Sequence, residues 1–151
     1  MMNRNTLVVV MLLVVAGAAH AQAPPPPPDD PIERELYPPE MIMGHGQLLG
    51  LQEKQRASIK SEVQKAQEKF FDHQWQMNEE REKMVALLRS VPIDEAKVLE
   101  QADKVMALER DIKRVHLALL IRLKNLLSPE QIAKLDEVRR EEMRRNEQRR
   151  R

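Results

Sequence analysis

Mostly apolar residues recur at alternating spacings of four and three along two stretches of the chain. The first set occupies positions 59, 63, 66, 70, 73, 77, 80, 84, 87 and 91, and the second occupies 98, 102, 105, 109, 112, 116, 119, 123 and 126. This is the heptad spacing, which keeps one face of a helix apolar. The pattern therefore predicts two long helices, each with an apolar seam along one side.

The segment "SVPID" (90–94) separates the two helices. Pro92 disfavours helical conformation at Val91, and Asp94 is a good N-cap for the helix that follows. Because the connection is short, the two helices are expected to form an antiparallel hairpin. The first helix, of roughly 38 residues, would be about 57 Å long.

Shorter helices are expected at both ends of the hairpin. "EMIMGHGQLL" (40–49) predicts a short helix weakened by its glycines. Ser128, Pro129 and Gln131 form the start signal of a last helix. We therefore predict an all-α fold, in which a long antiparallel helical hairpin carries a short N-terminal helix and a C-terminal helix that folds back. So slender a hairpin has little core, and we expect a homodimer to complete its burial.

Four polar residues interrupt the two seams: His73, Glu80, Glu109 and His116. In a hairpin that turns near residue 92, position 73 faces position 112, which lies between Glu109 and His116. Three interpretations stay open. The residues form a buried His–Glu pair that fixes the register, or they lie at the edge of the seam and face water, or imidazoles and a carboxylate bind a divalent metal.

The N-terminal segment has the form of a signal peptide. Arg4 precedes an apolar run at 7–15, and "AHA" (19–21) has the small-x-small form of a cleavage site, so we expect 1–21 to be removed after Ala21.

The proline-rich segment 22–39 is expected to be a disordered tether, 40–140 the helical domain, and 141–151 a charged, frayed tail. The apolar run is too short to span a membrane, which takes about 20 residues, and no cysteine is present to carry a lipid anchor. These features predict an exported, soluble, periplasmic protein without a transmembrane segment in its mature chain.

Composition narrows the possible functions. The chain has 25 basic and 24 acidic residues, for a net charge of +1, and this balance argues against a dedicated nucleic-acid binder. No Ser/His/Asp set, glycine-rich phosphate loop or HExxH motif accompanies the histidines. We therefore expect no enzymatic activity.

Two further groups of side chains are candidates for binding. Met41 and His45 are four residues apart, so their thioether and imidazole can face the same way as ligands for a transition metal. Phe71 and Trp75 lie off the main seam and, together with Met77, are candidates for an apolar client-binding surface.

The stretches "LGLQEKQRASI" (49–59) and "LLSPEQIAKL" (126–135) resemble the two LTxxQ-type motifs of the Spy/CpxP family of periplasmic stress proteins. Gln52 and Ser128 stand at the positions of the threonine N-caps. The segments "YPPEMIMGH" and "ERDIKRVHLALLIRLKNLLSPEQ" resemble the related CnrX/ZraP-like periplasmic heavy-metal sensors. The resemblance covers about residues 36–140.

This resemblance implies a dimeric helical hairpin without enzymatic activity. Spy-like members are ATP-independent chaperones, and CpxP-like members also restrain an envelope-stress sensor kinase. The CnrX-like branch binds metals through histidines of the first helix, a carboxylate, and a His-x-x-x-Met sequence on the third helix. His45 and His116 match family histidines and Glu62 is a place for the carboxylate, whereas Leu120 stands where the methionine would follow.

We therefore expect a periplasmic ATP-independent chaperone or envelope-stress accessory protein that requires no cofactor. Its partners would be unfolded periplasmic proteins or an envelope-stress sensor protein. The alternative is a periplasmic heavy-metal sensor that binds nickel, cobalt, zinc or copper. Its ligands would be Met41, His45, Glu62 and His116, with His73 and Glu109 as an alternative cluster.

Overall fold

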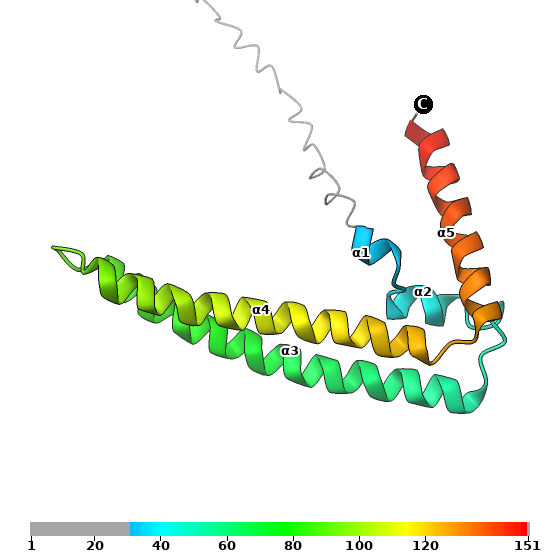
Figure 1. Ribbon diagram of the computed structural model, residues 1–151, viewed down its shortest axis with the longest axis horizontal. Helices are drawn as coiled ribbons and strands as arrows, with labels where there is room; N and C mark the ends of the chain where they lie inside the picture. The colour runs from blue at the N-terminus through cyan, green and yellow to red at the C-terminus, as the bar shows by residue number, and fades with distance from the viewer. Residues whose placement is uncertain (1–30, 151) are drawn as a thin grey trace, which may run out of the picture.

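The computed structural model describes residues 31–150, all of whose regular elements are helices. In chain order they are α1 (Pro31–Arg34), α2 (Pro39–Gly44), α3 (Glu53–Leu88), α4 (Glu95–Asn125) and α5 (Pro129–Arg150) (Figure 1). The predicted all-α fold is confirmed. The expected signal peptide and residues 22–30 of the expected tether lie outside the described residues.

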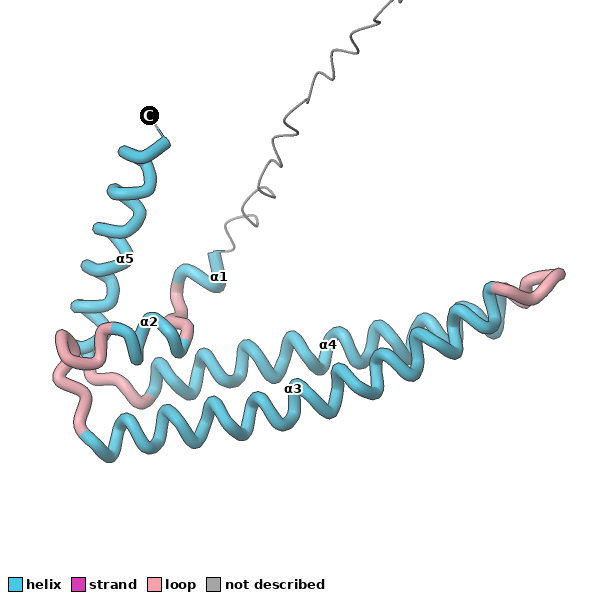
Figure 2. The backbone as a smooth tube through the Cα atoms, turned by 180° about the vertical axis from the view of Figure 1, so that it is seen from behind, coloured by secondary structure: helices cyan, strands magenta, loops and turns pink. Residues whose placement is uncertain are grey.

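The two longest helices, α3 and α4, run side by side in opposite directions, as both views show (Figures 1 and 2). The Asp94 side chain accepts a hydrogen bond from the Lys97 backbone N–H at 3.2 Å and so caps the start of α4. The seam positions Ile59, Ala66, Val105 and Leu123 are buried between the helices. The predicted hairpin and its turn are therefore confirmed.

The core lies at the open end of the hairpin, where α2 and the first turns of α5 cover the seam. Its buried members come from every part of this end: Tyr37, Ile42, Leu49, Leu51, Ile59, Ala66, Leu119, Leu123, Leu127 and Leu135. The half towards the turn is thin by comparison, and Leu99 and Met106 on α4 are more than half exposed there. Burial, and with it most of the hydrophobic stabilisation, is concentrated at one end of the molecule.

The glutamines of the two LTxxQ-like motifs bond to each other in this end. Gln55 Nε2 donates to Gln131 Oε1 at 3.0 Å, and Gln131 Nε2 donates to Gln55 Oε1 at 3.2 Å. Gln55 also donates to the Leu126 carbonyl oxygen, and Gln131 donates to that of Leu49. The pair therefore joins the start of α3, the turn before it and the turn between α4 and α5.

Residues 31–39 differ from the disordered tether expected for this part of the chain. They form α1 and then bury Tyr37, which is only 2% exposed. Its hydroxyl donates to Asp136 Oδ1 at 2.6 Å, and Arg139 lies over its ring at 4.6 Å from the centroid. Arg139 also donates to the carbonyls of Arg34 and Leu36. Proline content alone predicted the tether, but an aromatic ring with a bonded hydroxyl stabilises order here.

The two outer helices end at other residues than predicted. The short N-terminal helix ends at Gly44, and turns occupy 45–50, where Gly50 has a φ of 61° that favours glycine. At the other end, α5 continues past residue 140 to Arg150, so the expected frayed tail is helical up to that residue. Only the first turns of α5 fold back on the core, and residues 140–149 are exposed.

Because the core is concentrated at one end, replacing a leucine by alanine should lower the free energy of unfolding by different amounts at the two ends of the hairpin. Leu123→Ala, at a fully buried residue, is expected to lower the free energy of unfolding by about 2–5 kcal/mol. Leu99→Ala, at a residue 58% exposed, should change it by no more than about 0.5 kcal/mol. Denaturant unfolding followed by circular dichroism measures both, and equal losses would contradict this distribution of the core.

The environment of Tyr37 should make stability depend on alkaline pH. Burial, the hydrogen bond to Asp136 and the negative charge of Asp136 raise the pKa of Tyr37 from 10.0 to about 12. The neutral phenol is thus favoured in the folded state, and its contribution is complete below pH 10 and is lost as the pH rises through about 12. Unfolding measured from pH 8 to 12 should show a steeper loss for wild type than for Tyr37→Phe. Parallel curves would contradict the assignment.

Candidate functional site

His45 lies at the end of α2 and is bonded to the helix that it terminates. Its Nδ1 is 2.9 Å from the Met41 carbonyl oxygen, and its backbone N–H bonds to the same oxygen. Because a carbonyl only accepts, the neutral ring must carry its proton on Nδ1, which leaves a lone pair on Nε2. Metal-binding histidines commonly use this arrangement. The structure therefore bonds His45 to the Met41 backbone and leaves one imidazole nitrogen able to bind a ligand, while the Met41 side chain packs against the core.

Glu62, the predicted carboxylate ligand, is paired with cations. It accepts a hydrogen bond from Lys65 Nζ at 2.8 Å, and its other oxygen is 3.5 Å from Arg122 Nη1 on α4. The hydrogen bond with Lys65, followed by the positive charges of Lys65 and Arg122, lowers the pKa of Glu62. A metal ion at Glu62 would have to displace these partners.

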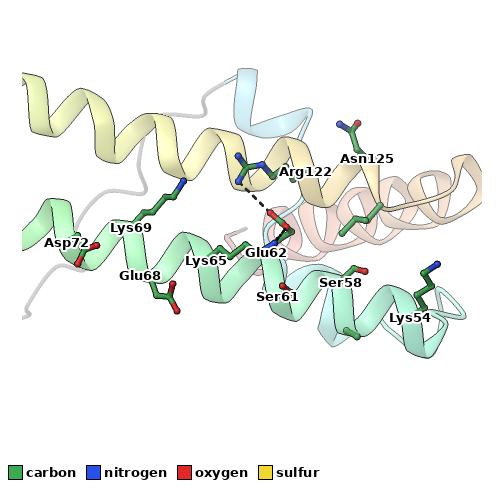
Figure 3. Close-up of a pocket in the computed structure, with 12 residues that line it drawn as sticks. Lys54, Ser58, Ser61, Glu62, Lys65, Glu68, Lys69, Asp72, Arg122 and Asn125 are labelled. Atoms are coloured by element: carbon green, nitrogen blue, oxygen red, sulfur yellow. Dashed lines mark hydrogen bonds and ion pairs between the residues drawn. The ribbon is translucent and has the colours of Figure 1, made fainter.

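This ion-paired carboxylate lines a wide, open groove of about 940 Å³ along α3 and the end of α4 (Figure 3). Lys69 extends from α3 towards α4, and Arg122 extends from α4 towards Glu62 (Figure 3). Glu68 and Asp72 point away from α4. Sequence reasoning missed this groove because it forms only where charged positions of two helices are brought side by side.

His116 does not lie in the seam between the helices. It is exposed and lines a separate, largely apolar groove of about 400 Å³. The other residues that line this groove are Pro38, Pro39, Glu40, Val63, Ala66, Gln67, Phe70, Phe71, Val115 and Leu119. The heptad spacing placed His116 on the seam, but at this level the two helices and the start of α2 surround an opening instead of closing over the histidine.

The other polar residues of the seams are also apart from one another. Glu109 pairs with Arg81 at 2.8 Å, and Glu80 accepts hydrogen bonds from Lys83 and from the buried Gln101. His73 has a buried Nδ1 without a hydrogen-bond partner among the described residues. The predicted His–Glu pair is therefore not formed, and the bonds across this part of the hairpin are those of Gln101 to Glu80 and of Arg81 to Glu109.

Within residues 31–150, no three His, Asp or Glu side chains lie close enough to hold a metal ion together. The structure bonds His45 to the backbone carbonyl of Met41, places Glu62 with Lys65 and Arg122, and places His116 in the apolar groove. The four residues of the predicted metal set do not converge in this arrangement.

The predicted apolar surface is present with one correction. Phe71 is 69% exposed and Trp75 is 63% exposed, with its Nε1 bonded to Glu79 at 3.0 Å. Met77 is only 5% exposed, because it occupies a seam position that faces α4, so it is not part of this surface. Phe70, which the seam pattern placed in the core, is 46% exposed at the edge of the apolar groove.

A protein-family model described as heavy-metal resistance matches residues 6–134 of the chain. No curated protein and no solved structure matches it. None of the helices among residues 31–150 is long and apolar enough to cross a membrane.

Proposed function

Since this chain belongs to the heavy-metal resistance family, part of the Spy/CpxP/ZraP-like group of periplasmic helical proteins, we propose that it is a periplasmic stress protein that holds unfolded clients without ATP. The observation that carries the proposal is the exposed aromatic surface of α3 beside an apolar groove. Phe70 and Phe71 line this groove, and Trp75 follows one turn later.

The size and lining of the groove suit apolar side chains of an unfolded chain. A volume of about 400 Å³ has room for one or two large side chains. Burial of one such side chain contributes about 1.5–3 kcal/mol. Because association itself costs free energy, so small a surface favours weak and reversible binding. This is the behaviour required of a protein that retains clients and then releases them without an energy source.

Charges around the aromatic residues support the same function. Glu68, Lys69 and Asp72 are exposed on the same turns of α3 as Phe70 and Phe71. Charges of both signs attract segments of either charge at long range, after which local apolar contact retains them. Such a surface selects for exposed apolar groups and not for one sequence.

In the first test, Phe71→Ser/Trp75→Ser should lose most of the protein's ability to suppress aggregation of a denatured model client, followed by light scattering. The matched control is Met143→Ser, which removes an apolar side chain 46% exposed on α5. The mass of each variant is measured as well, so that a lost function can be separated from loss of the expected homodimer. Suppression that is absent in wild type, or equal in all three proteins, would contradict the proposal.

We propose metal binding as a second candidate function, with the metal as cargo or signal. The supporting observation is the bond between His45 Nδ1 and the Met41 carbonyl, which leaves Nε2 available four residues from a thioether. Imidazole and thioether donors suit nickel, cobalt, copper or zinc. The remaining ligands would have to come from a rearrangement that brings His116 nearer or from a second copy of the chain.

Calorimetric titration with these metals tests the second candidate. His45→Ala/His116→Ala should bind about 10–100-fold more weakly than wild type, because removing a donor usually costs that much or more. His73→Ala, which removes a histidine from the seam, should bind as wild type does. No heat of binding in wild type, or equal affinity in the double variant, would exclude this function.

A further inference from the structure

A small notch between α3 and α4 is lined by three cations. Its volume is about 190 Å³, and its lining consists of Ala66, Lys69, Arg114, Val115, Ala118 and Arg122. Among these side chains, all within the described residues, there is no carboxylate. The other three lining residues are two alanines and a valine, whose side chains offer no hydrogen-bond acceptor.

Within residues 31–150, the side chains of Lys69 and Arg114 form no ion pair or hydrogen bond. The positive charge of Lys69 nevertheless contributes, after those of Lys65 and Arg122, to lowering the pKa of Glu62. Arg122 has only the 3.5 Å approach to Glu62, which also binds Lys65 at 2.8 Å. Like charges that line one notch repel each other, and an anion placed between them would offset that repulsion.

From this cluster we propose that the notch binds a phosphate group. Three positive charges, two of which Glu62 partly compensates, match a dianion better than a single carboxylate. Guanidinium groups donate to phosphate oxygens in pairs, and a lysine ammonium adds a third direction. The notch is smaller than the 300–1,000 Å³ typical of sites for whole organic ligands, so it fits the compact phosphate and not a large molecule attached to it.

The notch has two lining residues in common with each of the two larger grooves. It shares Lys69 and Arg122 with the wide charged groove of Figure 3, whose lining contains no residue of α1 or α2. The apolar groove is lined instead by Pro38, Pro39 and Glu40, although Ala66 and Val115 contribute to both. The three cations do not line the apolar groove, so phosphate binding goes beyond the proposed chaperone function and can be tested separately from it.

The phosphate could belong to a free ion or to an anionic phospholipid headgroup, and two titrations distinguish these sources. Inorganic phosphate is titrated by calorimetry at low ionic strength, where screening is weak. Vesicles containing phosphatidylglycerol are compared with vesicles of phosphatidylcholine alone in a sedimentation assay. Binding of inorganic phosphate identifies the free ion as a ligand, and selective binding to phosphatidylglycerol identifies the headgroup.

The variants separate a built site from general positive charge. Lys69→Gln and Arg114→Gln should each weaken binding about tenfold, because each removes a charged hydrogen-bond donor. The control is Lys113→Gln, which changes the net charge equally at the neighbouring position of α4, where the exposed side chain does not line the notch. Circular dichroism confirms that each variant is folded.

Two results would overturn the proposal. One is that neither inorganic phosphate nor phosphatidylglycerol vesicles bind the wild-type protein. The other is that Lys113→Gln weakens binding as much as Arg114→Gln, which would show a diffuse charge effect. Suppression of client aggregation by Arg114→Gln, measured in parallel, is expected to match wild type, so the outcome for the phosphate site is independent of the outcome for the chaperone.

Discussion

The reciprocal hydrogen bonds between Gln55 and Gln131 determine how the open end of the molecule is assembled. Each amide donates to the other and to a carbonyl oxygen in a turn, so one pair of side chains satisfies backbone groups at Leu49 and Leu126. Gln131 is only 8% exposed, and a buried amide without such partners would cost about 1–3 kcal/mol for each lost bond. The turns that bring α2 and α5 over the hairpin can therefore pack tightly only when both glutamines are in place. This gives a physical reason for the two similar motifs at distant positions in the chain.

The hairpin could be predicted from the sequence because its causes are local. Heptad spacing defines the seams, Pro92 ends one helix, and Asp94 starts the next, so each seam and each helix end depends on a few neighbouring residues. The position of Tyr37 could not be predicted in this way. It is buried by Asp136 and Arg139, about a hundred positions later, and only the pair Leu36–Tyr37 within the proline-rich segment hinted at a contact.

The candidate site was less predictable than the fold for a similar reason. A seam tells which side of each helix faces the other, but not how far apart the helices are at each level. At Phe70 and His116 they leave a groove, so residues that the pattern placed in the core are exposed. Nor does spacing tell which charges pair: Glu62 binds Lys65 and approaches Arg122, and Glu109 binds Arg81. The two outward-facing aromatic residues, Phe71 and Trp75, were predicted correctly because their displacement from the seam is a local property.

The attachment of Tyr37 to α5 has a mechanical consequence. Through this contact and the bonds of Arg139 to the carbonyls of Arg34 and Leu36, the described chain enters the molecule at the end where the core lies. The 31 residues of α4 extend about 46 Å from that end to the turn. Among the described residues, the hairpin is therefore held by the core at its open end, while the residues of its turn, such as Val91 and Ile93, are exposed. A small rotation at the base would be magnified along its length, while a force applied at residue 31 would reach the core before it reached the slender arm.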